Sequence, residues 1–374
     1  MENLNFFKYS LDIFKFLRLW NKRVNQEKSR LATISLYTMI VINGSIIPLI
    51  CISDILRSAR TVEVPVLLCK ALFGLAYPVC IYKLISVTIY KNEIYGCITQ
   101  IEALSSRFQV QKDIKQSLET YKKMIFIGSI AMNFCVLLVL VVSILNNELP
   151  FRSRLSVLDL NQSPTYELMF FYQAIALTTV ANLTVAHDTL FCGLLSICAA
   201  ILSSISREVR DIDVRWENGG NPEIILKEII EKIKETFCII ERVSNVFSIT
   251  TLTNILYSSN QMALSVYLVS VWGLKDLTGM LMVIIALIQT FDLWIYCYFG
   301  QIIANQNEKL QRELYCTNWY NHSKQFKSML LLTIFVTQND RFVKAGRIIA
   351  LSLATFSDFL KKAYVLYTFL TEVR

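Results

Sequence analysis

Few side chains in this sequence have the types and spacing that catalysis or metal binding requires. Histidine occurs only at positions 187 and 322, so a histidine-based metal site or a Ser-His-Asp triad has almost nothing to draw on. The 10 cysteines include no C-x-x-C pair, the spacing typical of zinc cages and dithiol redox sites. A D-x-D pair at 211–213 resembles the metal-binding motif of sugar transferases, but its neighbours Arg210 and Arg215 favour a solvated charge cluster. The sequence therefore predicts no enzyme and no metal or cofactor site.

His187, Asp188 and Asp292 stand in apolar surroundings, where ionisable groups are functional candidates by default. Counting about 20 residues from a helix start near Leu168 places Asp188 at the inner edge of a membrane. A structural role at that edge is therefore the better interpretation of the His187-Asp188 pair. Asp292 is predicted to pair with a lysine or arginine at the base of a neighbouring helix.

The elements that position these residues are predicted to be membrane helices. Hydrophobic residues make up 54% of the chain and charged residues 18%, and the mean hydropathy is +0.46, far from an average soluble protein. A helix that crosses a bilayer needs about 20 apolar residues. We expect an all-α membrane protein with a single domain over residues 1–374 and seven transmembrane helices. The predicted spans are 31–53, 65–90, 124–147, 168–188, 246–272, 277–303 and 345–370.

Lysine and arginine predict the orientation of these spans. With the N-terminus in the cytosol, the inner segments hold 26 of these residues and the outer segments 6, which satisfies the positive-inside rule. The C-terminus is then extracellular, and Asn161 is a glycosylation candidate in an outer loop. Cys51 and Cys69 fall near the outer face, where they either form a disulfide or pack as small residues. The net charge of +8 follows from topology and anionic inner-leaflet lipid, so it does not indicate nucleic-acid binding.

Two of the inner connections have the apolar spacing of amphipathic helices, at 92–108 and 222–247. The second begins at Asn221-Pro222, a capping residue followed by proline at the first helical position. We expect the fourth, fifth and sixth spans to project into the cytosol and pack together as an anchor. The alternative is that these helices lie flat on the lipid surface.

Three stretches resemble the insect odorant receptors: "HDTLFCGLLSICAAILSSISREVRDI", "CYFGQIIANQNEKLQRELYCTNWY" and "LSLATFSDFLKKAYVLYTFL". The resemblance covers the whole chain in length and topology, and residues 296–374 carry its most specific part. That part contains Gly300, the spacing from Tyr315 to Trp319, and a series in the last span: Phe356, Lys361, Tyr364, Tyr367 and Leu370.

The resemblance implies an odorant-gated, non-selective cation channel in which four subunits surround a pore lined by the seventh helix of each. Tyr364, Tyr367 and Leu370 would then form a hydrophobic gate near the outer mouth of the pore. From spacing alone, the same stripe could equally pack against the protein's own bundle. Lys361 and Lys362 would repel cations unless they point into a lateral opening, pair with Asp358 or lie beside groups of other subunits.

The resemblance also implies partners and a location. The connection between spans four and five has only about 40 residues, which indicates a ligand-tuned subunit that assembles with the longer co-receptor in a heterotetramer. The expected cellular location is the plasma membrane of olfactory neuron dendrites. A gustatory-receptor-like channel subunit is the alternative, although the Thr-Tyr...Gln-Phe signature of that family is absent. A G-protein-coupled receptor would need the opposite orientation, and a transporter would show paired, interrupted helices.

By family resemblance, a volatile ligand binds in the outer half of the bundle between helices two, three, four and six. We expect a small, mostly apolar molecule held by one or two hydrogen bonds from Tyr77, Tyr172 or Gln173. Ordinary helix packing is the alternative role for each candidate. Mapped by depth, the candidates are Phe73, Tyr77, Phe134, Leu138, Val141, Phe170, Tyr172, Gln173, Met280 and Ile284.

Overall fold

The computed structural model describes residues 64–107, 111–146, 149–150, 164–338 and 343–372, with a few isolated positions before residue 64. Cys51 and Asn161 lie outside the described residues, as does most of the predicted span 31–53. The fold is mostly helical, as the sequence predicts. Its elements are α4 (Val64–Ile89), α5 (Lys91–Arg107), α6 (Gln111–Leu145), α7 (Thr165–Arg210), α8 (Ile212–Glu217), α9 (Pro222–Trp272), α10 (Leu277–Tyr315), η3 (Trp319–Asn321), α11 (Lys324–Thr337), β1 (Lys344–Ala345), β2 (Ile349–Ala350) and α12 (Leu353–Glu372).

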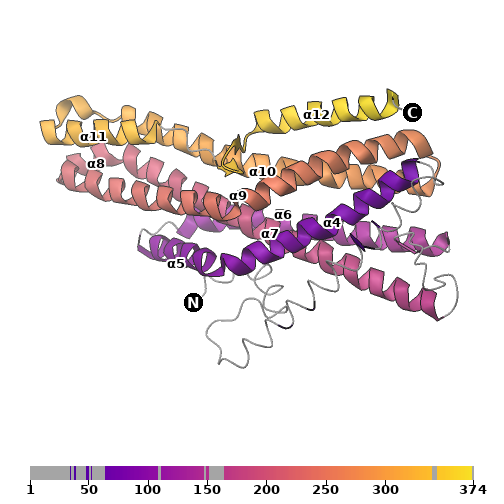
Figure 1. The fold of residues 1–374 in the computed structure, drawn as a ribbon. Coiled ribbons are helices and arrows are strands. Elements are labelled where there is room, and N and C mark those ends of the chain that lie inside the picture. Colours follow the sequence, from indigo (N-terminus) through magenta and orange to yellow (C-terminus); the bar gives the residue numbers. More distant parts are fainter. Residues whose placement is uncertain are drawn as a thin grey trace.

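Three helices are far longer than a membrane is thick. Helices α7, α9 and α10 have 46, 51 and 39 residues. At 1.5 Å per residue the longest extends about 75 Å, more than twice the roughly 30 Å of a hydrocarbon core. They run together along an elongated bundle, with α8 and α11 at one end and α12 beside the other half (Figure 1). The structure thus confirms that these three helices continue well past the length of a membrane span; their cytosolic orientation stays a prediction.

The start of α9 follows from its local sequence. Asn221 Oδ1 accepts a hydrogen bond of 2.9 Å from the Glu223 amide, and Pro222 occupies the first helical turn. This is the predicted cap, which satisfies an otherwise unpaired amide. At the other end Gly273, with φ of 76°, ends α9. The side chain of Asp276 then accepts a hydrogen bond from the Thr278 amide and starts α10, so α9 and α10 form an antiparallel pair.

Helix α7 runs through the middle of the hydrophobic core. Nearly every residue from Val185 to Ile205 is buried, in one cluster with residues of α4, α5, α9, α10 and α11. Helix α5 turns Ile94, Ile98 and Ile101 towards this cluster. Helix α5, which includes the described part of the amphipathic segment 92–108, therefore packs on the bundle rather than lying apart from it on lipid.

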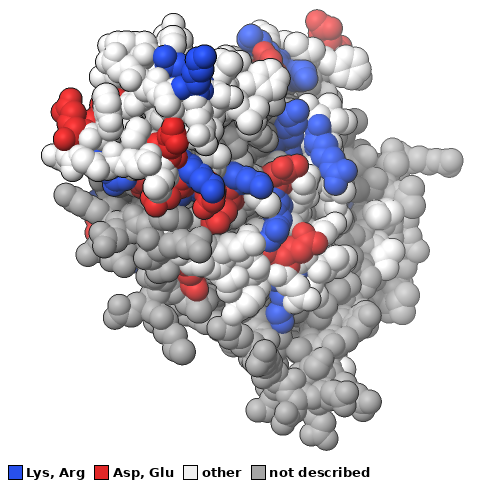
Figure 2. All heavy atoms as spheres, turned by 90° about the vertical axis from the view of Figure 1, so that its left-hand side faces the viewer, with Lys and Arg blue, Asp and Glu red and all other residues white. Residues whose placement is uncertain are grey.

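The end of the bundle that carries α8 and α11 is polar. Figure 2 shows lysine, arginine, aspartate and glutamate side chains interspersed over this end. Arg210 of α7 donates hydrogen bonds to Glu313 of α10, and this contact lowers the pKa of Glu313 below its usual range. The D-x-D pair is more than a solvated cluster, because Asp213 accepts a hydrogen bond of 3.2 Å from the Asn318 amide.

A short β-hairpin precedes the last helix, so the predicted span 345–370 starts too early. Strands β1 and β2 pair antiparallel, with Lys344 opposite Ala350, and α12 begins only at Leu353. Gly346 and Arg347 both have positive φ in the connecting turn. The Gly346 amide donates a hydrogen bond of 2.8 Å to the Ser248 carbonyl of α9, which fixes the hairpin to the bundle.

Four of the described helices are long and apolar enough to cross a membrane by length and composition. They are Pro65–Ile89, Phe126–Leu145, Thr165–Arg210 and Leu277–Tyr315. Helices α9 and α12 are not among these four. Both carry more polar side chains, such as Asp358, Lys361 and Lys362 in α12.

Candidate functional site

A cavity of about 130 Å³ lies inside the bundle between α4, α6, α7, α9 and α10. This is close to the roughly 150 Å³ of an engineered apolar cavity that holds benzene, so it fits a small organic molecule. Its apolar wall consists of Phe73, Ala76, Val79, Met132, Cys135, Val136, Val139, Leu177, Val180, Ala181, Ile285 and Ile288. Its polar groups are Lys83, Thr184, Asn254, Tyr257, Gln261, Gln289 and Asp292.

Helix α9 supplies much of the polar wall, which the sequence reasoning missed because it placed the pocket between helices two, three, four and six. Asn254, Tyr257 and Gln261 recur at intervals of three and four residues, so they share one face of the helix. Asn254 and Gln261 are buried. These residues form a polar stripe within an otherwise apolar span. The stripe could have indicated the cavity from the sequence, since polar residues of a membrane helix turn towards the bundle interior.

Next to the cavity, a buried carboxylate joins three helices. Lys83 Nζ of α4 lies 2.7 Å from Asp188 Oδ1 and 3.0 Å from Oδ2, on α7. His187 Nδ1 lies 2.9 Å from Asp188 Oδ1, and the Tyr296 hydroxyl of α10 donates a hydrogen bond to the same oxygen. The side chain of Lys83 is 2% exposed. The structural role predicted for His187 and Asp188 is therefore filled by a network inside the bundle.

Asp292 of α10 does not make the predicted salt bridge. Its Oδ2 atom accepts hydrogen bonds from Asn254 Nδ2 at 2.8 Å and from Ser258 Oγ at 3.0 Å, both on α9. Within the described residues, no lysine or arginine lies within ion-pair distance of Asp292. Lys83 lines the same cavity, but its ammonium group is held by Asp188. Two neutral donors thus replace the expected cation.

A second hollow, of about 290 Å³, lies between α6, α7 and α10. It is bordered by exposed apolar side chains, including Ile127 and Leu287. Met132, Ile288 and Asp292 line both this groove and the inner cavity. These three side chains therefore form the boundary between the two spaces.

Seven of the ten predicted ligand-binding residues are buried or half-buried and fall into three groups. Phe73 lines the cavity. Tyr77 and Tyr172 pack in a neighbouring cluster with Ala176. Gln173 is buried, whereas Leu138, Phe170 and Ile284 are half-buried.

The other three candidates lie on the outer surface and do not line the cavity, so we revise them. Phe134, Val141 and Met280 are 52%, 41% and 52% exposed. Depth alone selected these positions, but rotation about the helix axis decides what a side chain faces. On α6 the inward positions are Cys135 and Val139.

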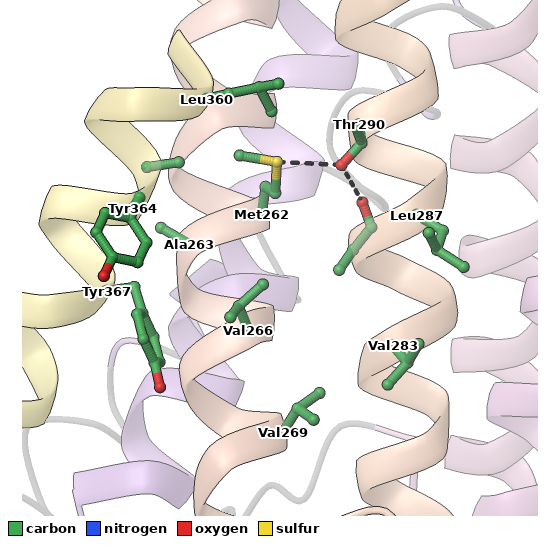
Figure 3. Close-up of a pocket in the computed structure, with 12 residues that line it drawn as sticks. Met262, Ala263, Val266, Val269, Val283, Leu287, Thr290, Leu360, Tyr364 and Tyr367 are labelled. Carbon is green, nitrogen blue, oxygen red and sulfur yellow. Dashed lines mark hydrogen bonds between the residues drawn. The ribbon is translucent and has the colours of Figure 1, made fainter. Parts of the chain in front are cut away.

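The three residues proposed for the gate have different surroundings on α12. Tyr364 is 66% exposed, whereas Tyr367 and Leu370 pack against a buried cluster that includes Tyr267 and Leu281. Tyr364 and Tyr367 also border an apolar hollow of about 380 Å³ between α9, α10 and α12 (Figure 3). The stripe is therefore partly packed against the protein's own bundle.

The two lysines of α12 lie on its exposed face. Lys361 Nζ lies 3.6 Å from Asp358 Oδ1, which is one of the arrangements expected from the sequence. Lys362 Nζ lies 5.1 Å from the centre of the Phe359 ring.

The family model described as 7tm Odorant receptor matches residues 64–364. The chain belongs to the insect odorant receptor family. The matched range includes α4 to α11 and every residue of the cavity of 130 Å³, whereas Tyr367 and Leu370 of α12 lie beyond it. The family is one of membrane receptors, and the receptor is a multi-pass membrane protein.

Individual relatives agree with this assignment. Odorant receptor 2a of Drosophila melanogaster is 27% identical over 241 residues, covering 61% of the receptor and 61% of that protein. Odorant receptor 82a of the same species is 24% identical over 239 residues, covering 61% of the receptor and 58% of its own length. The receptor thus matches about three-fifths of the length of these curated relatives.

The fold is shared with a solved receptor. The olfactory receptor OR5 from Machilis hrabei, in complex with eugenol, superimposes with a TM-score of 0.84 at 14% identity over 100% of both chains. A second structure of the same receptor gives a TM-score of 0.83 at 16% identity, over 98% of this chain and 97% of that one. At this identity the likeness shows the seven-helix fold alone.

Proposed function

We propose that the chain is the odorant-sensing subunit of a ligand-gated, non-selective cation channel. Membership of the odorant receptor family supports odorant sensing. The observation that carries the proposal is the cavity inside the bundle, whose lining is mostly apolar with a smaller number of polar side chains. Such a lining is typical of sites for small organic ligands.

The ligand is a small volatile molecule enclosed by α4, α6, α7, α9 and α10. Phe73 remains one of its contacts, and Met132, Tyr257 and Ile288 replace the surface positions suggested by depth. Binding opens the channel only to the extent that the ligand prefers the open state over the closed one. Tight but equal binding to both states would open nothing.

The pore is formed by α12 of four subunits, with Tyr364, Tyr367 and Leu370 as a hydrophobic gate. The exposed face of α12 supports this, because Tyr364 and Val365 are 66% and 63% exposed in the single chain. Exposed apolar side chains that gather on one helix indicate a surface that lipid or another subunit covers.

The remaining subunits include an odorant co-receptor, in a heterotetramer at the plasma membrane of olfactory neurons. The N-terminus and the polar end of the bundle with α8 and α11 face the cytosol, and the C-terminus faces outward. The excess of lysine and arginine in the predicted inner segments supports this orientation.

Voltage clamp of cells that express the chain with and without an insect odorant co-receptor tests the proposal. A panel of alcohols, esters, terpenes, amines and aromatics is applied, and surface labelling confirms that both proteins reach the membrane. We expect a ligand-evoked cation current that requires both subunits. Current from this chain alone would contradict the co-receptor partnership, and no current from any member of a broad panel would contradict the channel proposal.

A further inference from the structure

We propose that Asp292 makes the cavity selective for small, mostly apolar ligands that carry a hydrogen-bond donor, that is, a hydroxyl or amino group. This inference rests on the proposed odorant-binding function and specifies the ligand class. It follows from the position of the Asp292 carboxylate, from the hydrogen bonds that Lys83 and Asn254 already make, and from the chemistry of the remaining polar side chains in the lining.

The Asp292 carboxylate stands where the cavity meets the groove between α6, α7 and α10, since it lines both spaces. Its Oδ2 atom accepts from Asn254 and Ser258. Within the described part of the chain no group donates a hydrogen bond to Oδ1. An acceptor atom at the edge of an apolar cavity is therefore available to a ligand.

The one lysine of the described lining makes no ion pair with Asp292. Lys83 Nζ lies within 3.0 Å of both carboxylate oxygens of Asp188, and the Tyr296 hydroxyl donates to Asp188 as well. Asp188, which lies beside the cavity, thus holds the ammonium group of Lys83, and Asp292 in the lining is left with hydrogen bonds from neutral donors. A donor from the ligand would supply the hydrogen bond that the protein does not provide at Asp292, and leaving a buried polar group unpaired costs binding energy.

Two of the other polar side chains of the lining are already engaged, since Lys83 donates to Asp188 and Asn254 donates to Asp292. The remaining ones do not discriminate between donors and acceptors. Thr184, Tyr257, Gln261 and Gln289 can each donate or accept a hydrogen bond. An ionised carboxylate only accepts. A site built to bond a hydroxyl or amino group rejects an analogue without that group more strongly than an apolar pocket rejects a change of one methylene.

The cavity volume limits the size of the ligand to about that of one ring with a short substituent, given its 130 Å³ and the comparison with benzene. The matched probes are therefore benzyl alcohol and benzylamine as donors, and benzyl methyl ether and toluene as donor-free analogues. Hexanol and hexyl methyl ether provide an unbranched pair. All are applied to cells that express the chain with the co-receptor, and the concentration for half-maximal current is measured.

In the wild-type channel we expect a donor ligand to act at least tenfold more potently than its donor-free partner. Asp292→Asn has nearly the same volume and keeps an oxygen for Asn254 and Ser258, but it presents an amide. We expect it to reduce the preference to less than threefold. Asp211→Asn, the same change at an exposed position on the polar end, should leave the ratio unchanged.

Equal potency of donor and donor-free ligands in the wild type would overturn the inference and leave the channel proposal standing. Retention of the full preference by Asp292→Asn would overturn it in the same way. If Asp292→Asn does not reach the surface, the wild-type ratio alone decides. Absence of any current from the broad panel, with both proteins at the surface, overturns the proposed function and this inference together.

Discussion

The ammonium nitrogen of Lys83 and the carboxylate of Asp188 lie 2.7 Å apart although the two residues are 105 positions apart in the chain. Tyr296 donates to the same carboxylate, so one buried group ties α4, α7 and α10 together next to the cavity. These are three of the five helices that enclose the cavity. A movement of α4 or α10 relative to α7 would therefore have to break the contacts of Lys83 or Tyr296 with Asp188 unless these side chains follow it.

Lys83→Met is expected to destabilise the protein, because it leaves a buried carboxylate without its cation. Breaking a buried pair from one side costs about 3–5 kcal/mol. Asp188→Leu should cost a similar amount by stranding the ammonium group. The double variant should lose less than the sum of the two single variants, because neither charge is then left alone. Thermal unfolding midpoints of the detergent-solubilised protein measure these effects.

Lys361→Met provides the control for this prediction. Lys361 and Asp358 form a pair of the same residue types, but their side chains are 75% and 64% exposed. Exposed pairs contribute about 0–1 kcal/mol, so the midpoint should barely move. Strict additivity of the Lys83 and Asp188 effects would show that the two side chains do not depend on each other.

Gly300→Ala is expected to destabilise the junction between α10 and the last helix. A Cβ atom at Gly300 would lie 2.3 Å from Leu351 Cβ and 2.5 Å from the Leu351 carbonyl oxygen. Overpacking costs about 1–3 kcal/mol, which exceeds the gain of roughly 1 kcal/mol from replacing a helical glycine by alanine. Gly128→Ala is the matched control on α6, since a Cβ there meets nothing within 4 Å. It should raise the midpoint, and an equal rise for Gly300→Ala would refute the close contact.

The helices themselves were predictable because their signals are local. The Asn221-Pro222 start of α9 and the apolar spacing of α5 both depend on residues within one or two turns. The length of the projecting helices followed from apolar spacing that continues from the spans into the amphipathic connections.

The hairpin and the cavity could not be predicted in the same way. Residues 344–350 are largely apolar, and each strand has only two residues, so they resemble the start of the last span. The turn depends on positive φ at Gly346 and Arg347, which a hydropathy pattern does not report. For the cavity, hydropathy gives depth in the membrane but not helix rotation, so Phe134 was chosen where Cys135 lines the space. The partners of Asp292 depend on the packing of α9 against α10, which lies outside any local pattern.

Cysteine labelling is expected to establish the orientation. Cys238 and Cys316 are exposed, whereas Cys97 is buried, and burial raises the pKa of its thiol to about 11. In a variant with Cys51→Ser and Cys69→Ser, a membrane-impermeant maleimide at pH 7.4 should label only after the cells are permeabilised. Cys316→Ser and Cys238→Ser together should remove that signal. Labelling of Cys316 on intact cells would place the polar end outside and contradict the proposed topology.

The buried Cys97 supplies an internal control for the same experiment. Its thiol should remain unmodified in the folded, permeabilised state and react only after denaturation, because a thiol with a raised pKa carries almost no reactive thiolate. Fast labelling of Cys97 in the native protein would show that α5 does not pack on the bundle.

Changes on α12 should separate packing from gating. Leu370→Ala removes a side chain that packs on the buried cluster, so we expect a lower unfolding midpoint together with more current in the absence of ligand.

Tyr364 is 66% exposed in the single chain, so Tyr364→Ala should leave the midpoint of that chain unchanged. If its ring helps to exclude water from the closed pore, ligand-independent current should nevertheless rise in the assembled channel. Val365→Ala, at a position of similar exposure one residue further along the helix, should change neither quantity. An unchanged resting current in Tyr364→Ala would remove Tyr364 from the gate, and a rise in both variants would mean that the whole exposed face of α12, rather than one stripe, holds the channel closed.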